Sequence, residues 1–207
     1  MKNFLRNLLI LSSLLLVIRP VLAKDSLVVL GDSLSAGYGI PQSQTWVSIL
    51  SERWQQQYPD LEIVNASISG ETTAGALRRL PAILERHEPL AVFVELGGND
   101  GLRAFDLNSI SSNLQEIIET IQATNANVAL SQIRVPPNYG QRFSQLFADV
   151  YSNVAEQQTV ELIPFFMEPL VDNPDYIQDD GIHPTAAAQP LIADFLEPYL
   201  LQLVGKG

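Results

Sequence analysis

The sequence predicts an α/β fold, a three-layer α/β/α sandwich around a five-stranded parallel sheet. Short apolar runs with β character alternate with longer stretches of helical periodicity along the chain. The run at 90–96 is apolar except for Glu95, which is typical of a strand buried on both faces. A polar or glycine-rich segment follows each of the five apolar runs. Because ligands bind beyond the carboxyl ends of parallel strands, these five loops should converge on one rim of the sheet.

The expected elements alternate regularly. Strands are predicted at residues 26–30, 61–65, 90–96, 128–133 and 160–163. Helices are predicted at residues 42–58, 73–87, 109–124, 141–157 and 185–203. The stretch 102–107 is expected to be a loop and a movable wall of the site. Pro190 and Pro198 disturb the last predicted helix. Its side chains expected to face inward are Leu191, Ile192, Phe195, Leu196, Tyr199 and Leu203.

Residues 1–23 have the organisation of a secretory signal peptide, and residues 24–207 are expected to form a single domain. The segment combines a basic start, an apolar run and a small-residue cleavage signal, provided by Lys2 and Arg6, residues 8–18, and Val21-Leu22-Ala23. A membrane anchor is the alternative, but the apolar run is short for a span and Arg19-Pro20 interrupts it. The sequence predicts cleavage after Ala23 and a periplasmic or secreted protein without a stable membrane anchor.

The composition excludes several classes of function. The chain has 23 acidic residues, 12 Lys and Arg residues and no cysteine. Lys2, Arg6 and Arg19 leave with the signal peptide, so the remaining chain carries nine basic residues and a net charge of −14. Such a charge repels polyanions and argues against nucleic-acid binding. Without cysteine there are no disulfides, thiolate nucleophiles or cysteine-based zinc sites, and we expect neither a metal nor another cofactor.

Two segments contain the residues of a serine nucleophile and its base. Ser33 lies in Gly31-Asp32-Ser33-Leu34-Ser35, directly after the first apolar run, and His183 closes Asp180-Gly181-Ile182-His183 after the fifth. Serine is a poor nucleophile until a base takes its proton and a third group orients that base. Taken alone, Ser33 is more typical of a helix cap than of a nucleophile, and the matching histidine reverses that preference. The chain has only two histidines, and His87 lies at a predicted helix end, where a structural role is expected.

Two neighbouring carboxylates compete to orient His183. Gly181 permits the tight turn that would bring the Asp180 carboxylate back to the imidazole. Asp179 is the rival, and because adjacent side chains of an extended segment point apart, only one of the two can serve. Spacing favours Asp180 and leaves Asp179 open.

Hydrogen-bond donors for a developing oxyanion are expected on the same rim. Gly70 follows the second predicted strand and Asn99 the third. A glycine lets its backbone N–H approach a substrate closely, and an asparagine amide donates without adding charge. With the backbone N–H of Ser33 they make three candidate donors.

Together these segments resemble the four blocks of the SGNH hydrolases, also called GDSL esterases. The matching residues are Gly31-Asp32-Ser33-Leu34-Ser35, Gly70, Gly97-Gly98-Asn99-Asp100 and Asp180-Gly181-Ile182-His183. The segments at 65–70, 132–134, 164–167 and 178–184 are similar to the branch of periplasmic thioesterase I/lysophospholipase L1 (protease I) and arylesterase. The resemblance implies a flavodoxin-like SGNH hydrolase fold, a triad of Ser33, Asp180 and His183, and an oxyanion hole of Ser33, Gly70 and Asn99. It also implies Asp180 rather than Asp179, since the family pattern is Asp-x-x-His.

Other families fit less well. The α/β-hydrolase elbow is G-x-S-x-G, and here Ser35 takes the place of the second glycine. No Walker A pattern occurs, and Gly37-Tyr38-Gly39 lacks the third glycine of a dinucleotide fingerprint.

The sequence therefore predicts a serine hydrolase that cleaves carboxylic esters and thioesters of lipophilic acyl groups, with a small-molecule ester, thioester or lysophospholipid as substrate. The apolar residues expected to bind the acyl group are Leu102, Phe105, Val135, Pro136, Tyr139, Phe166 and Ile182. Core packing is the alternative for Phe165, Phe166 and Met167. Two other functions remain open at this point: a carbohydrate O-acetyl esterase or acyltransferase on the same site, and a non-catalytic binding module.

Overall fold

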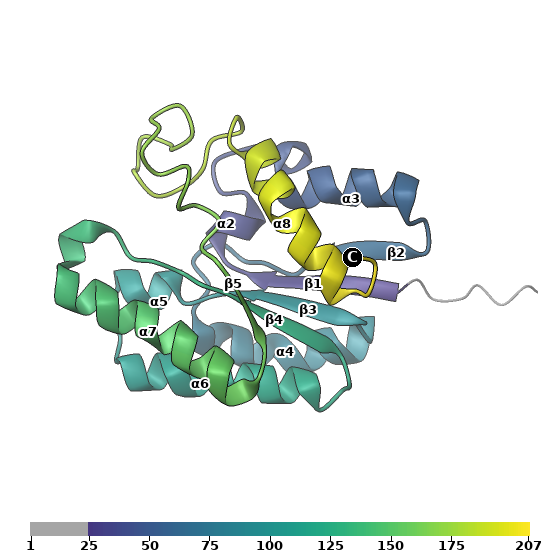
Figure 1. Ribbon diagram of the computed structural model, residues 1–207, viewed down its shortest axis with the longest axis horizontal. Coiled ribbons are helices and arrows are strands. Elements are labelled where there is room, and N and C mark those ends of the chain that lie inside the picture. The colour runs from purple at the N-terminus through teal and green to yellow at the C-terminus, as the bar shows by residue number, and fades with distance from the viewer. Residues whose placement is uncertain (1–24) are drawn as a thin grey trace, which may run out of the picture.

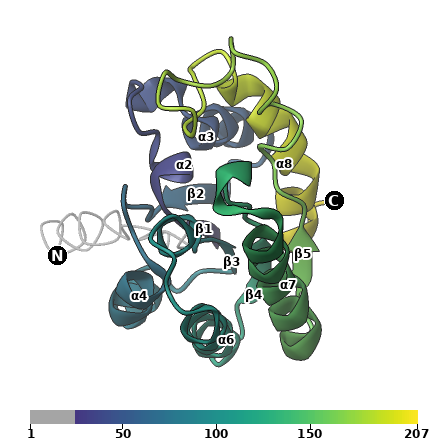
Figure 2. The same ribbon diagram turned by 90° about the vertical axis from the view of Figure 1, so that its left-hand side faces the viewer.

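In the computed structural model, which describes residues 25–207, a five-stranded parallel sheet lies between two layers of helices (Figure 1). The strands are β1 (Asp25–Gly31), β2 (Leu61–Asn65), β3 (Ala91–Glu95), β4 (Asn127–Ser131) and β5 (Glu161–Ile163). The helices α3 (Trp46–Gln57) and α8 (Gln189–Leu203) cover one face, and α4 (Thr73–His87), α6 (Leu107–Gln122) and α7 (Gln141–Gln158) cover the other (Figure 2). The predicted three-layer sandwich is confirmed. The predicted signal peptide, 1–23, lies outside the described residues.

Short helical segments occupy several of the connections. They are α2 (Ser33–Ala36), η1 (Gln42–Gln44), α5 (Gly98–Leu102) and η2 (Pro137–Tyr139). The helix predicted at 42–58 is thus a 3₁₀ turn followed by α3, because Thr45 adopts an extended backbone and caps α3 by accepting from Ser48 N–H. The loop predicted at 102–107 is also shorter than expected. Leu102 ends α5, and Asp106 caps α6 by accepting from Ser109 N–H.

The strand order, β2-β1-β3-β4-β5, opens a crevice at the centre of the sheet. From β1 the chain moves outward to β2, then returns past β1 to β3 on its other side, so the loops after β1 and β3 diverge. This is the flavodoxin-like order that was expected, and the reversal between β1 and β3 is where such sheets bind ligands. Ser33 follows β1 and Asn99 follows β3, so both candidate residues lie at this position.

The core explains why β1 and β3 read as continuous apolar runs. Leu27 and Val29 face the layer of α3 and α8, whereas Val28 and Leu30 face the layer of α4, α6 and α7, and all four are fully buried. Side chains alternate between the two faces of a strand, so a strand covered on both faces must be apolar at every position. Glu95 breaks this rule at the end of β3, where it too is fully buried.

The C-terminal helix differs from the prediction in its start and in its buried face. α8 begins at Gln189, and the turn before it places Pro190 in the first helical turn, where a backbone N–H has no helical acceptor and proline is tolerated. Pro198 lies inside the helix. The prediction that Leu191 faces inward is wrong, because 40% of it is exposed. The buried face comprises Gln189, Ile192, Ala193, Leu196, Leu200 and Leu203. Among residues 25–207, no helix is long and apolar enough to cross a membrane.

Candidate active site

Ser33 begins α2 with its hydroxyl group directed at a histidine. The helix is capped by Asp32, whose carboxylate accepts from Leu34 N–H at 3.1 Å. The capping role that was the alternative for Ser33 therefore belongs to its neighbour. Ser33 Oγ instead lies 2.8 Å from Nε2 of His183, which comes from the loop before α8 and is 150 residues away in sequence.

The loop that contains His183 is shaped around Asp180. One oxygen, Asp180 Oδ1, accepts from the backbone N–H groups of Ile182 at 2.9 Å and His183 at 3.0 Å. The other, Oδ2, lies 2.6 Å from His183 Nδ1. Gly181 completes the turn at φ +74°, in the left-handed region that glycine tolerates best. With Nδ1–H donated to a carboxylate, the free Nε2 lone pair is turned to Ser33 Oγ.

The carboxylate of Asp180 is held in its charged form. Partial burial alone would raise the pKa of Asp180. Hydrogen bonds from the backbone and side chain of His183 and from Ile182 N–H, together with the His183 charge, outweigh burial and lower the pKa below its usual value. Asp180 therefore makes the contacts expected of an orienting group, and the geometry favours it over Asp179. His87 ends α4, and its carbonyl oxygen accepts from Ser26 near the start of β1, the opposite end of the strand from Ser33.

The candidate oxyanion donors come from the loops after β2 and β3. Ile68 N–H donates to Gly31 O at 3.1 Å, which holds the segment leading to Gly70 against the end of β1. Gly70 adopts φ +81°, and among residues 25–207 its N–H has no hydrogen-bond acceptor. Asn99 lines the same cavity as Ser33. Its Nδ2 donates to Asp32 Oδ2 at 3.1 Å, which leaves the second amide hydrogen for another acceptor.

Three residues near the site were not singled out from the sequence. The Tyr38 ring lies 4.5 Å from the His183 ring, centroid to centroid. Asp32 contacts Asn99, and the buried Glu95 lies behind both, with its Oε2 accepting from Ser35 Oγ at 2.7 Å. Glu95 did leave a signal in the sequence, since it is the one charged residue of an otherwise apolar strand.

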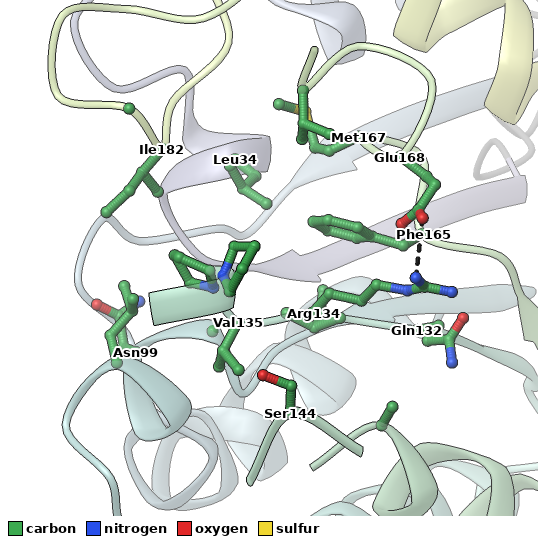
Figure 3. Close-up of a pocket in the computed structure, with 18 of the residues that line it drawn as sticks. Leu34, Asn99, Gln132, Arg134, Val135, Ser144, Phe165, Met167, Glu168 and Ile182 are labelled. Carbon is green, nitrogen blue, oxygen red and sulfur yellow. Dashed lines mark hydrogen bonds and ion pairs between the residues drawn. The ribbon is translucent and has the colours of Figure 1, made fainter. Parts of the chain in front are cut away.

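A cavity of about 770 Å³ extends from Ser33 across the ends of β4 and β5 toward α7. Figure 3 shows Leu34, Val135, Phe165, Met167 and Ile182 around it, with Asn99 at one end. On its far side Arg134 Nη1 lies 2.8 Å from Glu168 Oε1, a half-exposed ion pair drawn as a dashed line (Figure 3). The cavity therefore joins an apolar wall near the serine to a polar and charged outer end.

Four of the residues expected to bind the acyl group line this cavity: Leu102, Val135, Pro136 and Ile182. Three others lie elsewhere. Phe166 is fully buried in the core beneath α8, and in its place the preceding residue, Phe165, faces the cavity together with Met167. Phe105 is 45% exposed in the turn before α6, away from the cavity lining. Tyr139 packs on Phe143, and its hydroxyl group donates to Leu102 O at 2.7 Å, so it supports a lining residue without contacting the cavity.

Within residues 25–207, no group of three or more His, Asp or Glu side chains is arranged to hold a metal ion. The site brings together a hydroxyl group next to an imidazole, an imidazole next to a carboxylate, and amide donors at the same rim. This arrangement suits acyl transfer through serine.

Comparison with known proteins agrees with this geometry. Residues 29–190 match the GDSL-like lipase/acylhydrolase family. An arylesterase of Vibrio mimicus is 48% identical over 180 residues, covering 87% of this chain and 90% of the relative. A protein of Escherichia coli K12 named thioesterase 1/protease 1/lysophospholipase L1 is 47% identical over 182 residues, covering 88% and 86%.

The fold is shared with solved esterases. The psychrotrophic esterase EstA of Pseudoalteromonas sp. superposes with a TM-score of 0.84 at 41% identity, covering 88% of this chain and all of that one (100%). The TesA crystal structure gives a TM-score of 0.83 at 44% identity, covering 86% and 99%. The resemblance seen in the four sequence blocks is confirmed, and the chain belongs to the GDSL-like lipase/acylhydrolase family of hydrolytic enzymes.

Proposed function

We propose that this protein is a serine hydrolase that cleaves carboxylic esters and thioesters of lipophilic acyl groups. The observation that carries the proposal is the continuous contact from Ser33 Oγ to His183 Nε2 at 2.8 Å and from His183 Nδ1 to Asp180 Oδ2 at 2.6 Å. In this proposal Ser33 is the nucleophile, His183 the general base and Asp180 the group that orients it. The names of the relatives, arylesterase and thioesterase 1/lysophospholipase L1, support the ester and thioester class.

In the acylation step, Ser33 Oγ attacks the carbonyl carbon while His183 Nε2 takes the hydroxyl proton. The C=O bond becomes a single bond, and the oxyanion accepts hydrogen bonds from the N–H groups of Ser33 and Gly70 and from the Asn99 amide. When the tetrahedral intermediate collapses, the bond to the alcohol or thiol breaks and His183 returns its proton to the leaving group. Asp180 stabilises the imidazolium between these two proton transfers.

In the deacylation step, water takes the place of the leaving group. His183 removes a proton from water, the hydroxide oxygen bonds to the acyl carbon, and the same donors stabilise the second oxyanion. Collapse breaks the Ser33 ester bond, and His183 returns the proton to Ser33 Oγ. The products are a carboxylic acid and the free enzyme, with no cofactor consumed.

The cavity favours a lipophilic acyl group over an acetyl group. Leu34, Val135, Phe165, Met167 and Ile182 form apolar parts of the cavity wall, and a volume of about 770 Å³ far exceeds what an acetyl group fills. Each methylene that moves from water into this region contributes about 0.8 kcal/mol. Affinity is expected to rise with chain length until the acyl chain reaches the Arg134–Glu168 pair. The net charge, −11 for the full chain and −14 once residues 1–23 are removed, disfavours polyanionic partners such as nucleic acids.

Hydrolysis of p-nitrophenyl esters from acetate to long-chain acids tests the proposal. We expect kcat/KM to rise with chain length and then level off. A preference for acetyl esters of sugars, or a flat profile, would favour the carbohydrate O-acetyl esterase alternative. No release of p-nitrophenol from any ester would indicate a binding module.

We also propose that residues 1–23 are a signal peptide and that the enzyme works in the periplasm or outside the cell. The basic start, the apolar run and the Val21-Leu22-Ala23 cleavage signal support this proposal. The intact mass of the protein from the periplasmic fraction should correspond to a chain that begins at Lys24. A membrane-bound form that retains Met1 would contradict it.

A further inference from the structure

Glu95 is a buried carboxyl group placed directly behind the candidate nucleophile. It ends β3 and is fully buried. Its Oε2 accepts from Ser35 Oγ at 2.7 Å and from the backbone N–H of Asp32 at 3.3 Å. Both donors lie in the Gly-Asp-Ser-Leu-Ser segment that contains Ser33, so these two hydrogen bonds hold the segment against the end of β3. The catalytic steps given above do not use it.

The second oxygen of Glu95 shows that the side chain is poorly placed for a negative charge. Glu95 Oε1 is buried and receives no hydrogen bond from residues 25–207. Over the same part of the chain, the ion pairs involve Arg53, Arg79, Arg134 and His183, and none of them includes Glu95. A buried ionised carboxylate without a cation and with an unpaired oxygen is costly, whereas a neutral carboxylic acid gains a proton to donate.

The group beside Glu95 that can take that proton is Asp32. Its backbone N–H donates to Glu95 Oε2 at 3.3 Å, and its carboxyl group accepts from Leu34 N–H at 3.1 Å and from Asn99 Nδ2 at 3.1 Å. The donors make Asp32 the better site for the negative charge of the pair, because each stabilises an anion. Burial, followed by the charge of Asp32, raises the pKa of Glu95 well above its usual range.

The surroundings leave little room for any other arrangement. A Cβ on Gly31 would lie 2.7 Å from Glu95 Oε2, and a Cβ on Gly98 would lie 3.0 Å from Asp32 Oδ2. Glycine at both positions therefore provides the space that the carboxyl pair occupies. The charge of His183 favours ionised Asp32. On the side of α7 and α5, burial raises the pKa of Tyr151, and the charges of Asp100 and of the pair raise it further.

We propose that Glu95 is a neutral carboxylic acid hydrogen-bonded to an ionised Asp32, and that this pair positions the Asn99 amide for the oxyanion. Asp32 Oδ2 holds one Nδ2 hydrogen of Asn99, which fixes the amide so that its second hydrogen points to the reacting carbonyl group. Glu95 and Asp32 are positioning residues in this scheme, because they act through Asn99 and Ser33. The part of the proposal that concerns Asn99 rests on the proposed hydrolase function.

Infrared spectroscopy tests the protonation state without reference to activity. In D₂O at neutral pH, the wild-type protein should show the C=O stretch of a neutral carboxylic acid. That band should disappear in Glu95→Gln and remain in Glu62→Gln, which alters an exposed glutamate on the neighbouring strand β2. Should Glu95→Gln not fold, ¹³C labelling of the glutamate carboxyl carbons in the wild type identifies one protonated carboxyl group directly. Absence of a neutral carboxyl signal would overturn the proposal, even if the enzyme is fully active.

Kinetics test the positioning role. In Asp32→Asn, one of the two N–H donors, Leu34 N–H or Asn99 Nδ2, faces an amide NH₂ and loses its acceptor. We expect kcat to fall about 10- to 100-fold with KM nearly unchanged, a smaller loss than removal of an oxyanion donor itself would cause. Glu95→Gln, which keeps a donor for Asp32 and an acceptor for Ser35, should lower kcat less than Glu95→Leu does. Glu62→Gln should match the wild type. Equal losses for the two Glu95 variants, or an Asp32→Asn effect confined to KM, would contradict the positioning role while leaving the hydrolase function intact.

Discussion

The buried Asp32 should make the stability of this enzyme depend on pH in an unusual direction. Burial raises the pKa of Asp32 from 3.8 to about 6, against the hydrogen bonds from Leu34 and Asn99 that lower it. The folded protein therefore binds this proton more tightly than the unfolded chain does. The stability associated with Asp32 is fully present below about pH 4 and is lost as the pH rises through about 6.

The size of the effect follows from these two values. The difference between 3.8 and about 6 corresponds to about 3 kcal/mol of unfolding free energy that the wild type loses between acidic and neutral pH. Asp32→Asn removes the titrating group. The free energy of unfolding of the variant minus that of the wild type should therefore increase by about 3 kcal/mol from about pH 3 to about pH 8. The lost hydrogen bonds shift this difference at every pH. Loss of the Asp32 charge, which helps to raise the pKa of Glu95, changes the difference in the same direction.

Urea unfolding followed by tryptophan fluorescence measures this difference. Trp46 and Trp54 are both fully buried in the layer of α3 and α8, so their emission reports loss of the core. Asp25→Asn, an exposed change at the start of the same strand, provides the matched control and should show little change across the range. A flat Asp32→Asn difference, or one that falls with pH, would refute the reasoning.

The remaining predictions concern the site. Asp180→Asn should lower kcat on the order of 10⁴-fold by favouring the wrong histidine tautomer, whereas Asp179→Asn should have a small effect; the reverse ranking in ester hydrolysis would move the orienting role to Asp179. Asn99→Ala should cost about 3 kcal/mol in kcat with KM nearly constant, and a change confined to KM would assign Asn99 to substrate binding. Phe165→Ala should reduce activity on long-chain p-nitrophenyl esters more than on acetate, and an equal loss on both would place the acyl chain elsewhere.

The sequence predicted the fold because its layers leave strong local signals. Val28 and Leu30 face one helical layer while Leu27 and Val29 face the other, so β1 had to appear as an unbroken apolar run. The first and last residues of β2 and of α4 are the ones that were predicted. The predicted face of α8 is wrong at Leu191, while Ile192, Leu196 and Leu203 are buried as expected. Leu191 lies at the edge of the apolar face, where only tertiary contacts decide whether a side chain is covered.

The site was predictable where it depends on chain order and not where it depends on side-chain direction. Ser33, Asp180 and His183 could be matched because each follows a strand or closes a loop at the same rim. Phe166 and Phe165 are adjacent and chemically alike, and only packing shows that the first enters the core and the second faces the cavity. The pairing of Glu95 with Asp32 joins residues 63 apart along the chain, and no local pattern indicates it.

Covalent labelling tests the central claim that Ser33 is a nucleophile activated by His183. After treatment with an alkyl fluorophosphonate, intact mass spectrometry should show one adduct, and peptide mapping should place it on Ser33. His183→Ala should label far more slowly although Ser33 is still present, and His87→Ala should label like the wild type. An adduct on another residue, or undiminished labelling of Ser33→Ala, would contradict the account.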